Sequence, residues 1–293
     1  TLTMKNTDQH DAIPSSKYCT VNGVRIHYLE AGSGFPLILL HGSGPGAAGW
    51  SNYRRNFHAL AGQFHVFCLD MPGWGQSDMK PFEAPMPGWH ADTLSQFMTA
   101  LNLECAHLVG NSYGGAVALK LALEHPGKVG RLVLMGTSGG LPAFSPFPTM
   151  GIKAIYTFYD GEGPSLPRLQ AFLQEFVYDP SQITEEMLAH RLAAAMDPRV
   201  IENPPMRPNP KVPREELWRD SRLTKLPHET LMIWGREDRV MPLDLAFVLL
   251  KQIPRARLLV MPQCGHWAQW EHAEEFNSTV ADFCLASSRT QGK

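Results

Sequence analysis

A serine between two closely spaced glycines constrains this chain more than any other feature. In the run GNSYGG at residues 110–115, an apolar segment, 106–109, comes directly before and another, 116–123, directly after. The pattern predicts a buried strand, a sharp turn and a helix, with Ser112 at the bend. The flanking glycines let strand and helix pack closely around strained backbone. Such a turn directs the serine hydroxyl into a cleft, which makes Ser112 a candidate nucleophile.

A serine hydroxyl is a weak nucleophile near neutral pH, so this interpretation requires a histidine base and an acid that orients it. At strand–turn–helix serines, the order along the chain is serine, acid, histidine. Asp238 follows one downstream apolar run, with Glu237 as the competing acid, and His266 follows the next. Because the carboxyl ends of parallel strands share one edge of a sheet, we expect Ser112, Asp238 and His266 to meet there.

Each of these residues also has an ordinary explanation. A lone histidine on a loop is most often a surface residue, and an aspartate after a strand is usually a cap or a turn residue. Their joint occurrence in the required order, each after a predicted strand, favours the catalytic interpretation.

The glycine-rich run HGSGPG at residues 41–46 follows an apolar segment and is a candidate oxyanion hole. Acyl transfer develops negative charge on a carbonyl oxygen and needs two N–H donors in place. We expect them to be the backbone amides of Ser43 and of Tyr113. The run lacks the Gly-Lys-Ser/Thr ending and the Gly-x-Gly-x-x-Gly spacing of nucleotide sites, which disfavours a phosphate-binding loop.

These motifs resemble those of α/β-hydrolase fold enzymes over nearly the whole chain. Within that superfamily the chain is most similar to the meta-cleavage product hydrolases, which cut a carbon–carbon bond in the vinylogous 1,5-diketones made by ring-opening dioxygenases. The most specific strings are HGSGPG at 41–46, GWSN at 49–52, GNS at 110–112 and CGHWAQWEH at 264–272. The resemblance implies a mostly parallel, eight-stranded sheet flanked by helices, with an inserted helical cap.

Alternating strands and helices independently predict an α/β fold with right-handed crossovers. The expected strands are 17–21, 24–30, 37–41, 66–70, 107–111, 131–135, 230–234 and 257–261. Only Asn22 and Gly23 separate the first two, which predicts an antiparallel hairpin. Between 141 and 226 prolines punctuate helical pieces, among them 167–178 and 184–195. We therefore expect a core of residues 1–140 and 227–293 and a helical cap of residues 141–226.

The resemblance further implies a polar subsite for the dienolate and carboxylate end of a substrate. Relatives use an arginine from a cap helix there, and Arg191 is the matching position. Taken alone, a helical arginine more often pairs at the surface with acids such as Glu185 or Glu186. The remaining expected members of the subsite are Gly44, Asn52, Asn111 and Trp267.

The other end of the substrate is expected to meet apolar residues. The candidates are Leu141, Ile152, Phe172, Phe176, Met206, Trp218 and Val240. Tyr113 stands where many relatives have methionine, and the segment 203–213 is rich in proline. Both departures leave the apolar specificity open: monocyclic, biphenyl-type, dibenzofuran-type and steroid-type products share one polar head.

The implied reaction is hydrolysis of a 2-hydroxy-6-oxohexa-2,4-dienoate-type compound to 2-hydroxypenta-2,4-dienoate and a carboxylic acid, with no cofactor and no metal. A carboxylesterase or lactonase with the same three catalytic residues is the main alternative, and it has no use for Arg191. A perhydrolase or haloperoxidase, and a non-catalytic binding module on the same fold, are further alternatives.

Charge and composition exclude other partners. The formal net charge of −2 gives no basic footprint for nucleic acid or an anionic membrane, and the polar start of the chain has no apolar signal core. The five cysteines form no Cys-x-x-Cys pair, which favours a reducing compartment. We expect a cytoplasmic enzyme with a small-molecule substrate, and the resemblance implies a homo-oligomer, either a dimer or larger.

Overall fold

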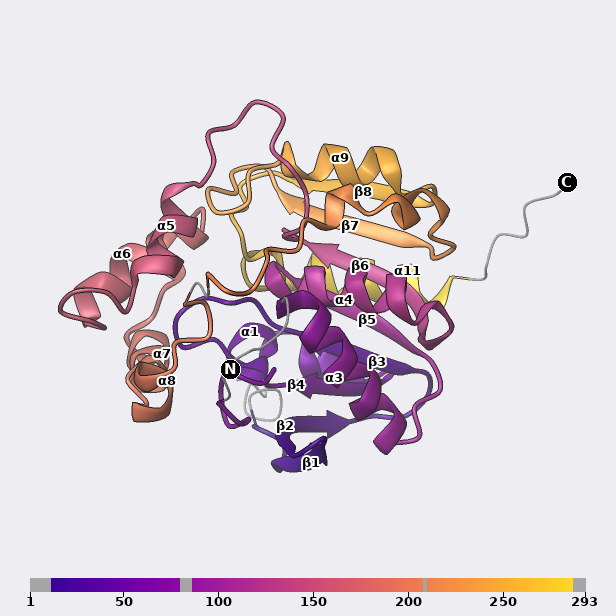
Figure 1. Cartoon of the computed structure of the whole chain (residues 1–293), viewed down its shortest axis with the longest axis horizontal. Helices are drawn as coiled ribbons and strands as arrows, with labels where there is room; N and C mark the ends of the chain where they lie inside the picture. The colour runs from indigo at the N-terminus through magenta and orange to yellow at the C-terminus, as the bar shows by residue number, and fades with distance from the viewer. Residues whose placement is uncertain (1–11, 80–85, 208–209, 287–293) are drawn as a thin grey trace, which may run out of the picture.

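The computed structural model describes residues 12–79, 86–207 and 210–286, and its centre is an eight-stranded sheet (Figure 1). The strand order is β1-β2-β4-β3-β5-β6-β7-β8, and every neighbouring pair from β4 to β8 is parallel. The strands are β1 Lys17–Val21, β2 Val24–Ala31, β3 Pro36–Leu40, β4 His65–Leu69, β5 Ala106–Asn111, β6 Val129–Met135, β7 Thr230–Gly235 and β8 Ala256–Met261. The predicted α/β fold, mostly parallel with eight strands, is confirmed.

The predicted hairpin at the start of the sheet is also confirmed. β1 and β2 are antiparallel, with Val21 opposite Val24. Asn22 and Gly23 both have positive φ, 48° and 74°, as a two-residue turn matched to the twist of the strands requires. β2 also pairs antiparallel with β4, which joins the hairpin to the parallel part of the sheet.

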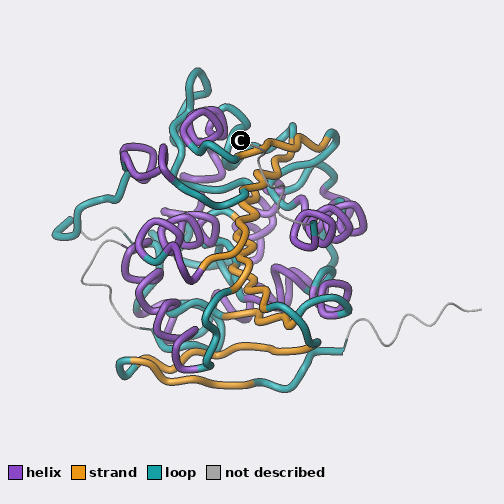
Figure 2. Tube along the Cα trace, turned by 90° about the vertical axis from the view of Figure 1, so that its right-hand side faces the viewer, coloured by secondary structure: helices purple, strands orange, loops and turns teal. Residues whose placement is uncertain are grey.

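Two layers of helices cover the sheet, as Figure 2 shows with the strands between them. Helices α3, α4 and α9 contribute to the apolar core on one face, and α1, α2 and α11 to that on the other. Their bounds are α1 Gly49–Tyr53, α2 Phe57–Ala61, α3 Met86–Ala100, α4 Tyr113–Glu124, α9 Leu245–Gln252 and α11 Ala273–Leu285.

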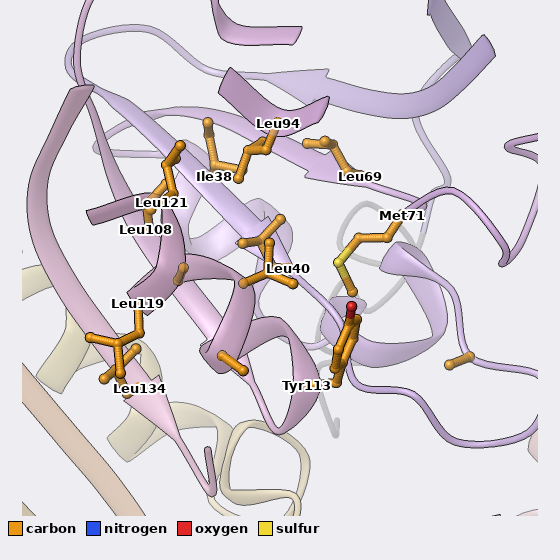
Figure 3. Close-up of a cluster of buried hydrophobic side chains, with 14 of the residues drawn as sticks. Ile38, Leu40, Leu69, Met71, Leu94, Leu108, Tyr113, Leu119, Leu121 and Leu134 are labelled. Atoms are coloured by element: carbon orange, nitrogen blue, oxygen red, sulfur yellow. The ribbon is translucent and has the colours of Figure 1, made fainter. Parts of the chain in front are cut away.

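Alternation along β3 explains why both faces are covered. Ile38 and Leu40 belong to one apolar cluster, part of which is drawn in Figure 3, whereas Leu37 and Leu39 belong to the other. Successive side chains of a strand point to opposite faces, so a strand of uninterrupted leucine and isoleucine needs helices on both sides. None of the helices in the described ranges is long and apolar enough to span a membrane.

Four further α-helices come between β6 and β7 in the sequence and lie to one side of the sheet (Figure 1). They are α5 Met150–Thr157, α6 Leu166–Phe176, α7 Glu185–Ala195 and α8 Pro198–Glu202. Thr184 caps α7 by accepting the N–H of Met187 at 3.1 Å. The prediction that the helix starting near 167 reaches Tyr178 is wrong: Val177 is already extended, because the chain turns there toward the loop that carries His266.

A buried carboxylate joins the end of β4 to its surroundings. Asp70 accepts hydrogen bonds from the backbone N–H of Gly49 at 2.8 Å and of Gln76 at 2.9 Å. Its Oδ2 also lies 2.8 Å from Nδ1 of His27. Burial opposes the charge, but His27 and the N–H donors outweigh it and hold the pKa of Asp70 below its usual value.

We expect Asp70→Asn to lower the free energy of unfolding by roughly 2–4 kcal/mol, because an amide cannot accept from all three donors. Urea unfolding measures the effect, with the exposed Asp92→Asn as the control. The folded pKa is lowered, so the contribution is complete above the unfolded pKa of about 3.9 and is lost as the pH falls through the folded pKa. A deficit that persists unchanged at still lower pH would contradict this account.

Candidate active site

Ser112 lies in strained backbone between β5 and α4, with φ 52° and ψ −115°. Its N–H donates to the carbonyl of Met135 at 2.8 Å. A Cβ on Gly110 would collide with the backbone of Gly114, and one on Gly114 would collide with the carbonyl of Leu40. Glycine is therefore required at both positions, because the strand and the helix are in backbone contact beneath the serine.

Asp238 and His266 form a fully buried pair. Oδ2 of Asp238 lies 2.7 Å from Nδ1 of His266, and neither side chain is exposed. Oδ1 of Asp238 accepts the N–H groups of Val240 and Met241, each at 2.9 Å, which fixes the carboxylate. Nε2 of His266 is buried and has no hydrogen-bond partner within the described ranges. With Nδ1–H donated to Asp238, Nε2 keeps a lone pair that can take a proton.

The competing acid, Glu237, is committed elsewhere. Its side chain is 29% exposed, lies 2.7 Å from the guanidinium of Arg236, and accepts the N–H of Cys264 at 3.1 Å. It thus ties two surface loops together, and Asp238 is the acid that contacts the imidazole.

The end of β6 brings the serine and the histidine pair to one place. A Cβ on Gly136 would lie 3.0 Å from Nδ1 of His266 and 3.1 Å from Oδ2 of Asp238. The preceding residue, Met135, accepts the N–H of Ser112. The three residues expected to meet at the carboxyl edge of the sheet therefore surround one strand end.

The glycine-rich loop after β3 runs beside the serine. A Cβ on Gly42 would lie 3.4 Å from Cβ of Ser112. The next residue, Ser43, and Ser112 both line one cavity. His41 holds the loop: its Nε2 accepts the N–H of Met71 at 2.9 Å, and its Nδ1 lies 2.6 Å from the carbonyl of Gly42. Burial lowers the pKa of His41, which favours the neutral ring that this bonding requires.

The side chain of Tyr113 continues into the buried cluster drawn in Figure 3. Its hydroxyl lies 2.7 Å from Nδ1 of His90, whose Nε2 lies 2.8 Å from the carbonyl of Pro72. Nδ1 of His90 also lies 3.0 Å from the carbonyl of Met86. Burial lowers the pKa of His90 to about 4, so the ring is neutral, and the tyrosine hydroxyl is hydrogen-bonded to it. This bond anchors the residue whose backbone amide is the second expected oxyanion donor.

Arg191 on α7 is a buried cation with no acidic partner within the described ranges. It is 2% exposed, its Nη2 donates to the carbonyl of Pro45 at 2.8 Å, and its Nε has no partner there. Its guanidinium lies 5.1 Å from the ring centre of Trp267, and a Cβ on Gly44 would lie 3.3 Å from Nη2. Burial lowers the pKa of Arg191 to about 10, which still leaves it charged at neutral pH.

Buried neutral polar atoms without partners in the described chain occur in two of the predicted subsite residues and in Gln269 as well. Nδ2 of Asn52 and Oδ1 of Asn111 are buried without a partner within the described ranges, as is Oε1 of Gln269. Nε2 of Gln269 donates to the carbonyl of Asn52 at 3.2 Å. Unsatisfied buried donors and acceptors are costly in a folded chain, and a bound ligand or water would supply their partners. Sequence reasoning missed Gln269, although it lies two residues after Trp267 in the CGHWAQWEH string.

A cavity of about 780 Å³ opens over Ser112 and Tyr113. A smaller cavity of about 250 Å³ shares Ser43 with it. Of the predicted apolar residues, Ile152 and Met206 line the larger cavity. Phe172, Phe176 and Val240 are buried, with the Phe176 ring 5.0 Å from the imidazole of His266, whereas Leu141 is 42% exposed. Sequence reasoning missed the lining residues Met86, Ala116, Ile155, Tyr156, Val212, Leu217 and Met241.

Comparison with known proteins agrees with this geometry. The family model of the alpha/beta hydrolase fold matches residues 36–273. The chain is 42% identical to a 2-hydroxy-6-oxononadienedioate/2-hydroxy-6-oxononatrienedioate hydrolase of Paraburkholderia phymatum, over 96% of this chain and 99% of the relative. It is also 42% identical to a 2-hydroxy-6-oxo-6-phenylhexa-2,4-dienoate hydrolase of Burkholderia cepacia, over 92% and 96%.

A solved meta-cleavage product hydrolase of Pseudomonas fluorescens superposes with a TM-score of 0.81 at 35% identity, covering 91% of this chain and 96% of that one. A solved 2-hydroxy-6-oxo-6-phenylhexa-2,4-dienoate hydrolase of Rhodococcus gives a TM-score of 0.79 at 30% identity, over 93% and 99%. The resemblance expected from the motifs is confirmed. The chain belongs to the α/β-hydrolase family and, within it, to the meta-cleavage product hydrolases.

Proposed function

We propose that this enzyme hydrolyses a carbon–carbon bond in a 2-hydroxy-6-oxohexa-2,4-dienoate-type ring-cleavage product through Ser112, Asp238 and His266. The products are 2-hydroxypenta-2,4-dienoate, or a substituted relative, and a carboxylic acid. The environment of Arg191 is the observation that supports this class of substrate. A buried guanidinium without an acid partner in the described chain suits a substrate that brings its own carboxylate, and a simple ester brings none.

The first half of the reaction prepares the leaving carbon. Arg191 and the unsatisfied Nδ2 donor of Asn52 bind the carboxylate and the oxygen on C2 of the substrate, and the unsatisfied Oδ1 of Asn111 accepts a hydrogen bond from the 2-hydroxyl. The proton of the 2-hydroxyl is lost and a proton is added at C5, so the dienol becomes its keto tautomer. Cleavage between C5 and C6 can then leave the electron pair on a carbon conjugated to the C2 carbonyl, and the fragment departs as a stabilised dienolate.

The second half is acyl transfer. Oγ of Ser112 attacks the carbonyl at C6, and Nε2 of His266 takes its proton while Asp238 stabilises the imidazolium. The amides of Ser43 and Tyr113 hold the resulting oxyanion. Collapse of this intermediate breaks the C5–C6 bond, the imidazolium of His266 gives its proton to the departing dienolate, and an acyl-serine remains beside a neutral imidazole. Water, deprotonated by His266, then releases the carboxylic acid and restores the serine.

We also propose that residues 141–226 form a cap on a core of residues 1–140 and 227–293. The helices between β6 and β7 are the evidence for this division. Through Ile152, Ile155 and Tyr156 they supply one wall of the cavity over Ser112. A homodimer or larger assembly, and a location in the cytoplasm, belong to the same proposal. Light scattering of the purified enzyme measures the first, and fractionation of the host cell the second.

We expect rapid decay of the yellow dienolate when the enzyme is mixed with 2-hydroxy-6-oxo-6-phenylhexa-2,4-dienoate or 2-hydroxy-6-oxonona-2,4-diene-1,9-dioate in a stopped-flow spectrometer. The dienolate absorbs only while its conjugation is intact, so decay together with release of the matching acid reports cleavage. A matched assay with p-nitrophenyl acetate and a lactone provides the comparison. Turnover of the ester or lactone, with both dienolates persisting, would assign the enzyme to the esterase or lactonase class.

A further inference from the structure

The C-terminal end of α6 is fastened to the loop that carries His266. The backbone N–H of His266 donates to the carbonyl of Phe176 at 2.7 Å. The guanidinium of Arg239, next to Asp238 in sequence, donates to the carbonyls of Gln174 and Val177. The loop that carries His266 and the loop that carries Asp238 are therefore both hydrogen-bonded to the C-terminal end of α6.

Glu271 completes this junction. It ends the short helix α10, Ala268–Glu271, and is partly buried. Its Oε1 accepts the N–H of Gly265 at 2.8 Å, and its Oε2 accepts the N–H of Tyr178 at 2.7 Å. One carboxylate therefore bridges the peptide just before His266 and the peptide just beyond α6.

The loop depends on these bonds because Gly265 offers no side chain to pack. A Cβ there would lie 2.7 Å from the carbonyl oxygen of Phe176 and 2.9 Å from the nitrogen of Tyr178, so the two backbones are already in contact. Hydrogen bonds to the Gly265 and His266 amides are what fix the approach of the loop. Displacing a catalytic group by about 1 Å can cost on the order of 100-fold in rate.

We infer that Glu271 is a positioning residue, which holds His266 in line with Ser112 by fastening its loop to the end of α6. The inference rests on the proposed roles of Ser112 and His266. The contact between α6 and the His266 loop would then affect proton transfer by His266, in addition to any effect on how α6 covers the substrate.

The test is Glu271→Gln, which keeps the shape of the side chain. Glutamine has one acceptor oxygen and one NH₂ donor, so either the Gly265 or the Tyr178 N–H must face a donor. We expect kcat on the dienoate to fall about 10- to 100-fold with KM within about 3-fold. The rate at which diisopropyl fluorophosphate labels Ser112 is expected to fall by the same factor, because labelling needs His266 as the base but no dienoate.

Glu274→Gln, an exposed neighbour on α11, is the matched control and should keep both rates. Glu271→Asp retains the charge on a stem one carbon shorter, reaches only one of the two amides, and should lie between; it carries the test if the glutamine variant does not fold. The downfield proton resonance of the His266–Asp238 hydrogen bond should shift in the folded variants.

Normal labelling rates in folded Glu271 variants overturn the inference, even if the melting temperature falls. A fall in kcat without a fall in labelling overturns it too, since Glu271 would then act on the substrate side alone. Failure of the proposed function is a separate result, because the wild-type enzyme would then label at Ser112 and leave the dienoates intact.

Discussion

Ser112→Ala is expected to lower kcat on the dienoate at least about 10⁴-fold. Nucleophile, base and acid act as a unit, so removing the nucleophile forfeits nearly the whole acyl-transfer step. The strained φ of 52° belongs to the backbone and is carried by alanine as it is by serine. We therefore expect the free energy of unfolding to stay within about 1 kcal/mol of wild type.

Stopped-flow absorbance and chromatography of the released acid separate binding from cleavage in this variant. The Ser112→Ala enzyme should still bind the dienoate, because Arg191 and the asparagine amides are untouched, yet release no acid. Ser278→Ala, an exposed serine on α11, is the control and should keep kcat at the wild-type value. Retention of more than a few per cent of wild-type turnover in Ser112→Ala would show that Ser112 is not the nucleophile.

The positions of the three proposed catalytic residues were predictable because each follows from a local pattern combined with one rule of topology. The position of Ser112 requires only a strand, a tight turn and a helix, and the glycines around it indicate the turn. Asp238 and His266 each follow an apolar run, and parallel strands bring their carboxyl ends to a common edge. The covering of both faces of β3 was equally readable, since a strand without polar residues cannot face water.

Contacts between distant backbone segments were not predictable in this way. Glu271 looks like an ordinary acid at the end of a short helix, and its role depends on where Val177 leaves α6. Pro180 signals in the sequence that the helix ends nearby, but not that its end contacts the His266 loop. Gln269 and the lining residue Met241 are similar cases: apolar periodicity does not separate a cavity wall from a packed core.

Arg191 is expected to lower the stability of the free enzyme while it strengthens the binding of substrate. The folded enzyme keeps this cation 2% exposed, with Nε unpaired and no acid beside it in the described chain, an arrangement that costs free energy when no substrate is bound. Functional sites are where a chain breaks such packing rules. Replacing the guanidinium by an apolar side chain of similar length should therefore relieve the free enzyme while it disables binding.

We expect Arg191→Met to lower kcat/KM for the dienoate by about 30- to 5,000-fold, the cost of leaving a buried carboxylate without its partner. The free energy of unfolding, measured in urea without substrate, should equal or exceed that of wild type, because the lost bond to the carbonyl of Pro45 is offset by removal of a desolvated charge. Hydrolysis of p-nitrophenyl acetate, which has no carboxylate head, is the internal control and should be nearly unchanged. If ester and dienoate turnover fall in parallel, or the variant loses more than about 2 kcal/mol of stability, Arg191 is a structural residue. The substrate class would then rest on the family relationship alone, because the dienoate and the ester would make the same demands on the remaining residues of the site.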